Sequence, residues 1–88
     1  MSKKPPSTST EWLDFMGRAV KKHVPICDIT FSVTPSPTVE GLYLGRLFVA
    51  EDYHMTIALR AGRLASIKSA LTEWALDYKE YLDAASMD

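Results

Sequence analysis

The chain has 88 residues, of which 47% are hydrophobic and 24% are charged, a balance that fits one small globular domain rather than a disordered chain. Its single cysteine, Cys27, excludes an intramolecular disulfide, and no stretch approaches the roughly 20 apolar residues that a membrane-spanning helix needs. The net charge of −1 disfavours a protein that wraps duplex nucleic acid, because such proteins are usually basic overall.

The charge is unevenly distributed along the chain. Residues 1–24 carry five basic and two acidic side chains, whereas residues 25–88 carry five basic and nine acidic ones. No apolar run near the start resembles a signal peptide, and a lone thiol is typical of a reducing compartment. We therefore expect a cytoplasmic protein that does not associate with a membrane.

The first element is predicted to be a helix that follows a polar tail at residues 1–9. The segment Thr8–Glu11 fits a capping box, and Thr10 is a competing cap, so the start is open by two residues. Pro25 is expected to end this helix. The predicted buried stripe has apolar residues at helical spacing: Trp12, Phe15, Met16, Ala19, Val20 and His23.

Period-two alternation then predicts three strands. Apolar residues occupy every second position through Cys27–Val33, which is typical of a strand with one buried face. The segment Thr34–Thr38 is expected to break this strand after Val33, because neither of its two prolines can donate a hydrogen bond to a neighbouring strand. The segments 42–50 and 53–60 are predicted to form a hairpin around Glu51 and Asp52.

The register of this hairpin is open, because a slip of one residue moves every side chain of a strand to the other face. An even loop places Leu44, Phe48, Met55, Ile57 and Leu59 on one face and leaves Arg46 among them. An odd loop or a bulge places Leu47 and Val49 on the core face instead, and displays Arg46, Phe48, His54 and Arg60 on the opposite face. We prefer the second register, because it avoids burying an unpaired arginine.

The last element is predicted to be a helix from about Leu64 to about Leu82, where apolar residues recur every third or fourth position. Residues 84–88 are expected to fray. The chain is thus predicted to be an α+β protein with one domain at residues 10–83. Its order is helix–strand–strand–strand–helix, with an antiparallel three-stranded sheet and both helices packed on one face.

No motif in the sequence predicts an enzyme. His23 and His54 have no cysteine, aspartate or glutamate at metal-ligand spacing. Cys27 is in phase with the apolar face of its strand and is expected to act as a small hydrophobic residue. Glu51 and Asp52 lie at a solvated hairpin tip, which offers no environment to separate two pKa values. We expect no catalytic site, metal, cofactor or small-molecule substrate.

The last helix carries the predicted partner surface. A five-turn helix is longer than a three-stranded sheet can cover, so its distal aromatic residues are expected to need a protein partner. This partner is a second copy of the chain, as in a homodimer, or a larger assembly that the protein regulates or inhibits. The predicted aromatic and apolar contacts are Trp74, Tyr78, Tyr81 and Leu82, and the acidic residues that complement a basic partner are Glu73, Asp77 and Glu80.

The alternative function is binding of single-stranded nucleic acid or RNA. Phe48 flanked by Arg46 and Arg60 is similar to a small stacking platform for unpaired bases. The residues assigned to this alternative are Arg46, Phe48, His54, Arg60, Arg63 and Lys68.

Overall fold

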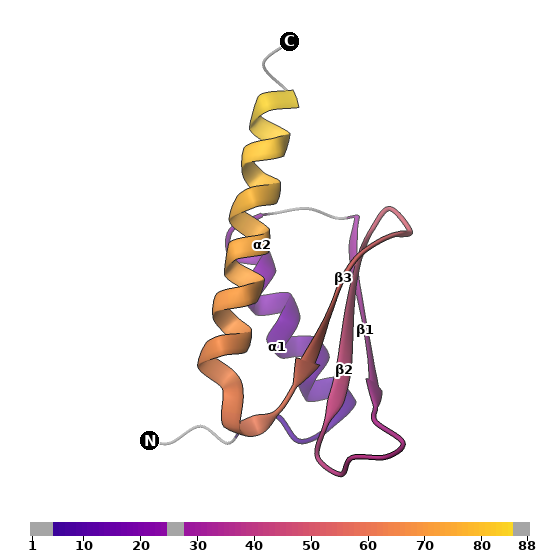
Figure 1. Ribbon diagram of the computed structural model, residues 1–88. Helices are drawn as coiled ribbons and strands as arrows, with labels where there is room; N and C mark the ends of the chain where they lie inside the picture. The colour runs from indigo at the N-terminus through magenta and orange to yellow at the C-terminus, as the bar shows by residue number, and fades with distance from the viewer. Residues whose placement is uncertain (1–4, 25–27, 86–88) are drawn as a thin grey trace.

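The computed structural model describes residues 5–24 and 28–85 as two helices on one side of an antiparallel sheet (Figure 1). The strand order is β1-β2-β3. This arrangement confirms the predicted fold class. The elements are α1 (Ser9–Lys21), β1 (Ile29–Pro35), β2 (Tyr43–Val49), β3 (Asp52–Leu59), the 3₁₀ turn η1 (Ala61–Arg63) and α2 (Leu64–Ala85).

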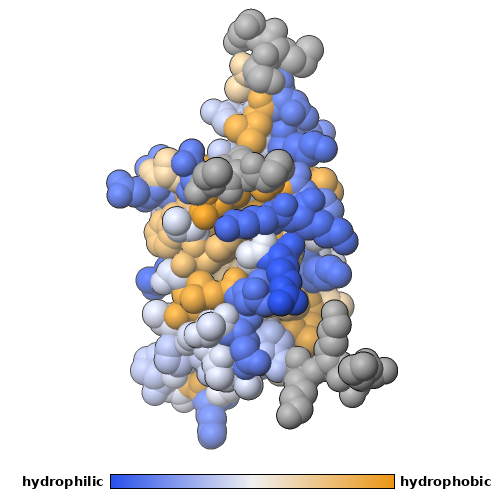
Figure 2. All heavy atoms as spheres, turned by 180° about the vertical axis from the view of Figure 1, so that it is seen from behind, coloured by the Kyte–Doolittle hydropathy of each residue, from blue (hydrophilic) through white to orange (hydrophobic). Residues whose placement is uncertain are grey.

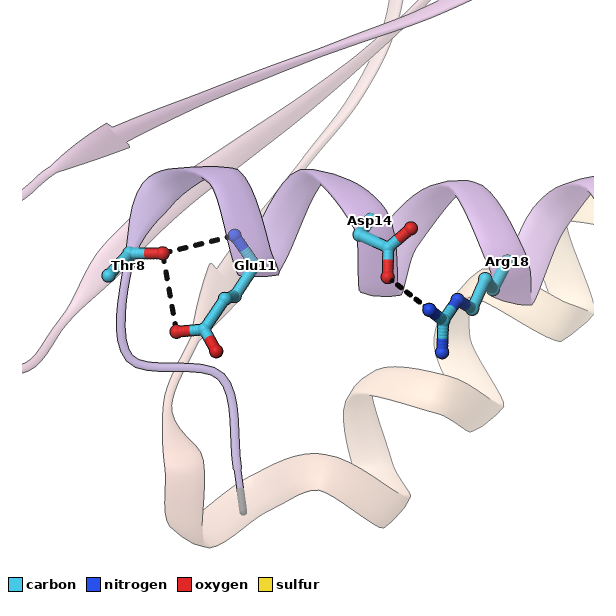
Figure 3. A network of polar contacts seen from close by, with 4 residues as sticks. All are labelled: Thr8, Glu11, Asp14 and Arg18. Atoms are coloured by element: carbon cyan, nitrogen blue, oxygen red, sulfur yellow. Dashed lines mark hydrogen bonds and ion pairs between the residues drawn. The ribbon is translucent and has the colours of Figure 1, made fainter. Parts of the chain in front are cut away.

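Helix α1 begins at a side-chain cap, which resolves the alternative between Thr8 and Thr10. The Thr8 hydroxyl accepts a hydrogen bond from the Glu11 backbone N–H at 3.2 Å and donates one to the Glu11 carboxylate (Figure 3). That carboxylate also accepts hydrogen bonds from the Ser7 N–H and hydroxyl, at 3.1 and 3.0 Å. The Tyr43 hydroxyl donates to the Ser7 carbonyl at 2.8 Å, so strand β2 holds the start of α1.

The core lies between the helices and the inner face of the sheet. Gly45 on β2 lies in close contact with this core, because a Cβ there would lie 2.8 Å from the Met16 sulfur and 2.9 Å from a Leu59 methyl. A side chain at this position would force the buried side chains of Met16 and Leu59 to move. The largest side chains that are fully buried are Trp12, Met16, Leu47, Leu59, Leu71, Val20 and Val24.

The β2–β3 hairpin has a two-residue turn and a bulge. Both central turn residues have positive φ, 50° at Ala50 and 74° at Glu51, as in the type I′ turns that suit tight hairpins. Leu47 pairs with Met55 but Phe48 pairs with Tyr53, so His54 is the extra residue of β3. The bulge produces the preferred register: Leu47 is buried and Arg46 is exposed.

Strand β1 and helix α2 both continue further than the sequence predicts. Strand β1 continues beyond Val33 to Pro35, which pairs with Tyr43, because an edge strand tolerates a residue that cannot donate on its open side. Helix α2 continues to Ala85 rather than ending near Leu82. The predicted role of Cys27 lies outside the described residues.

Helix α2 extends past the sheet. Its 22 residues make a rod of about 33 Å at the usual rise, whereas strands of seven or eight residues span only about 23–27 Å. Its C-terminal part projects beyond the sheet and beyond α1, and hydrophilic residues line one side of the projecting end (Figures 1 and 2).

Candidate partner-binding surface

Three aromatic rings stack along the distal half of α2. The Trp74 and Tyr78 rings lie 5.1 Å apart with planes 16° from parallel, and the Tyr78 and Tyr81 rings lie 6.0 Å apart at 17°. Spacings of four and three residues place successive side chains one above the other on a helix. We call Trp74, Tyr78 and Tyr81 the aromatic ladder; the sequence predicted all three as partner contacts, and the structure brings them into one stack.

The ladder is supported at one end and open at the other. The His54 ring lies edge-on to Trp74 at 5.7 Å and to Tyr78 at 6.2 Å. Trp74 and Tyr78 are half-buried, whereas 66% of Tyr81 is exposed. The ladder therefore starts against strand β3 and ends in solvent.

The position of His54 corrects the sequence prediction. His54 was expected beside Arg46 and Phe48 on the outer face of the sheet, yet its ring packs against α2. The physical reason is the bulge, because the extra residue on β3 turns its side chain away from the face that alternation assigns to it. A period-two pattern in the sequence gives no signal of where a bulge falls.

Three carboxylates form a row beside the ladder. Glu73, Asp77 and Glu80 are exposed, and at about 100° per residue they lie roughly 60–120° to one side of Trp74 around the helix. Within the part of the chain that the structure describes, none of the three forms an ion pair. We call these residues the carboxylate row; they too were predicted as partner contacts.

The other side of the ladder faces the core. Leu71 and Ala75 are completely buried on that side of α2, and the half-buried Leu82 packs against the same core cluster. The ladder thus forms the boundary between the protein core and a strip of unpaired negative charge. Such a surface offers apolar contact area and attraction for a cation side by side.

The residues of the nucleic-acid alternative do not form one surface. Arg46 and Phe48 lie on the outer sheet face, while Lys68 lines a groove of about 540 Å³ between α1 and α2. Arg60 and Arg63 are exposed around the η1 turn. The groove is also lined by Phe15, Leu64, Lys22, His23 and the Asp14–Arg18 pair, which forms a 2.7 Å ion pair on α1 (Figure 3).

The outer sheet face contains a second aromatic pair that the sequence analysis did not identify. The Tyr53 ring lies edge-on to Phe48 at 6.1 Å, and its hydroxyl is 2.8 Å from the Thr56 hydroxyl. Tyr53 is 59% exposed, and Arg46 is paired with Thr56 on the same face. Tyr53 reaches this face because the bulge follows it.

Residues 5–24 and 28–85 also bear on two further features, a metal-ligand cluster and a membrane-spanning helix. No group of three or more histidine, cysteine, aspartate or glutamate side chains in these ranges is placed to hold a metal ion. Neither α1 nor α2 is sufficiently long and apolar to cross a bilayer. The hydrogen bonds from Ser7 and Thr8 lower the pKa of Glu11, but this carboxylate belongs to a helix cap.

Comparison with known proteins adds no relative: no family model, curated protein or solved structure matches this chain. The function is therefore argued from the geometry of the surfaces alone.

Proposed function

We propose that the protein is a non-enzymatic, cytoplasmic binding module that holds a partner protein on the distal half of α2. The observation that carries this proposal is the exposed Tyr81 at the end of a stacked ladder, on a part of the helix that extends past the sheet. Exposed aromatic area next to ordered apolar side chains is the composition that protein interfaces favour.

The carboxylate row favours a partner with a basic surface. A second copy of this chain fits less well. Two copies packed antiparallel through this face would bring the two carboxylate rows together. Like charges in a desolvated contact oppose association, whereas lysine or arginine side chains of a different protein would pair with Glu73, Asp77 and Glu80. Binding of such a partner accounts for both halves of the surface.

A selection experiment tests this function without a known partner. The full chain is used to select binders from a random-peptide display library, and Tyr81→Ala serves as the matched variant. We expect peptides rich in lysine and arginine whose affinity falls by about tenfold with Tyr81→Ala, as for a modest hot spot. Selected peptides that bind both proteins equally would contradict the proposal.

Light scattering on the purified chain tests the choice of partner. The proposal expects a monomer at micromolar concentration. A dimer that Tyr81→Ala dissociates would instead identify a second copy as the occupant of this face.

A second candidate function rests on the outer sheet face. The Phe48–Tyr53 pair beside Arg46 is an arrangement on which unpaired bases can stack. Fluorescence anisotropy with short single-stranded oligonucleotides at low salt tests this candidate, because counterion release favours binding most there. Binding that Tyr53→Ala abolishes would support it, and no binding at low salt would exclude it.

A further inference from the structure

The stacking of the aromatic ladder ends at Tyr81. Trp74 is covered by Tyr78 four residues later, and Tyr78 is covered by Tyr81 three residues later. The positions that would cover Tyr81 in the same way hold Ala84 and Ala85, which are both exposed. Within the described residues, the C-terminal face of the Tyr81 ring therefore has no aromatic neighbour and is open to a planar group from outside.

We propose that the guanidinium group of a partner arginine stacks on this open face of Tyr81 and so extends the aromatic ladder. The inference rests on the proposed function and specifies its partner chemistry. A guanidinium is planar and stacks on an aromatic face while its edge donates hydrogen bonds. Glu80, the neighbour of Tyr81 in sequence, supplies an unpaired carboxylate for those hydrogen bonds, and Asp77, one turn before Tyr81, adds negative charge that attracts the cation.

The chemistry of the surface distinguishes arginine from other occupants. A lysine ammonium is a compact, strongly hydrated charge, so it gains attraction from the carboxylate row but little from a stacked planar contact. An aromatic side chain would stack on Tyr81 but would leave the carboxylates without a counter-charge. Only the guanidinium satisfies both features of the site.

The test is an NMR titration of the ¹⁵N-labelled full chain with three blocked peptides. The peptides alternate glycine with arginine, with lysine or with citrulline, which is the neutral planar analogue of arginine. We expect the arginine peptide to shift signals at Tyr78 and Tyr81, with affinity at least about threefold above the lysine peptide and tenfold above the citrulline peptide. Contacts between guanidinium and Tyr81 ring protons should appear in nuclear Overhauser spectra.

One variant covers the open face of Tyr81 without removing any aromatic ring of the ladder. Ala85→Tyr places a ring of this chain beside Tyr81, so we expect the arginine peptide to bind about fivefold more weakly. Leu76→Tyr adds the same side chain on the opposite side of α2, where Leu76 is 46% exposed, and should leave the affinity unchanged. Thermal unfolding by circular dichroism confirms that both variants fold.

The outcomes separate this inference from the proposed function. Equal binding of the arginine and lysine peptides, or no effect of Ala85→Tyr, would contradict the stacking of a guanidinium on Tyr81. If Tyr81→Ala and Asp77→Asn still weaken both cationic peptides in that case, the proposed function stands. The absence of any NMR shift at Tyr78 or Tyr81 with any peptide would also contradict this stacking. The display selection then tests the proposed function separately.

Discussion

The two helices differ in how much of their length is buried in the core. Four of the 13 residues of α1 are buried, whereas three of the 22 residues of α2 are buried, and none of those three follows Ala75. Helix α1 begins at the Thr8 cap, while the η1 turn that leads into α2 has no side-chain cap. Burial in the core therefore accounts for the ordering of α1 and of the first half of α2, but it is incomplete along the second half of α2.

This difference indicates where function lies. Each ordered residue loses backbone entropy worth about 1–2 kcal/mol, and burial in the core normally offsets it. Beyond Ala75 the offset comes from helix hydrogen bonds, from ring stacking within the ladder and from the half-buried Tyr78 and Leu82. A helix that continues without complete burial, and that displays rings on its open side, has a surface suited to a partner.

The largest expected effect sharpens the contrast between the two halves of α2. Leu71→Ala removes a side chain that is completely buried, so it should lower the free energy of unfolding by about 2–5 kcal/mol. Tyr81→Ala, at the exposed end of the same helix, should lower it by no more than about 0.5 kcal/mol. Urea titration followed by circular dichroism measures both, and similar losses at the two sites would remove the contrast.

The next effect tests how closely α1 depends on the sheet. Gly45→Val should destabilise the fold by about 1–3 kcal/mol, because even a Cβ at this position meets Met16 and Leu59 below 3.0 Å. Gly62→Val is a matched control, since nothing lies within 4 Å of a Cβ built there. If Gly45→Val left the urea midpoint unchanged, the contact between α1 and β2 would be looser than the structure has it.

A smaller effect concerns the side-chain cap that α1 has and the η1 turn lacks. Hydrogen bonds from Ser7, and then from Thr8, lower the pKa of Glu11. A carboxylate whose pKa is lowered in the folded state stabilises the fold above its unfolded pKa and loses that contribution as the pH falls through the folded pKa. Glu11→Gln should therefore be less stable than the wild type at pH 7, and the two stabilities should converge on acidification. A gap that widens at low pH would contradict this assignment.

The sequence was sufficient to predict the order of elements and the shared helix face of the three aromatic residues. Period-two and helical spacings locate the strands and helices, and spacings of four and three align Trp74, Tyr78 and Tyr81. Both patterns are local, so the sequence alone contains them. The predicted cap at Thr8 is also local, since it depends on two residues three apart.

The positions of His54 and Tyr53 could not be predicted in the same way. A bulge shifts the alternation by one residue, and its location depends on pairing between strands and on packing against α2. The preferred register was right because burying the Arg46 side chain is unfavourable. That argument fixes the orientation of β2 but does not say where in β3 the bulge falls. For that reason the predicted basic and aromatic set contained His54, and Tyr53 was missed.

The smallest expected effect on stability separates the two roles of α2 most directly. Glu73, Asp77 and Glu80 are like charges at spacings of four and three, which cost a helix a few tenths of a kcal/mol per pair. Asp77→Asn keeps the shape of the side chain and removes the charge, so it should raise the free energy of unfolding by a few tenths of a kcal/mol. The same variant should weaken the arginine peptide by about threefold or more, because it removes a carboxylate that pairs with the cation. Urea titration and NMR titration on one protein sample measure the two effects together. Loss of stability with unchanged peptide affinity would mean that the carboxylate row serves the fold and not a partner.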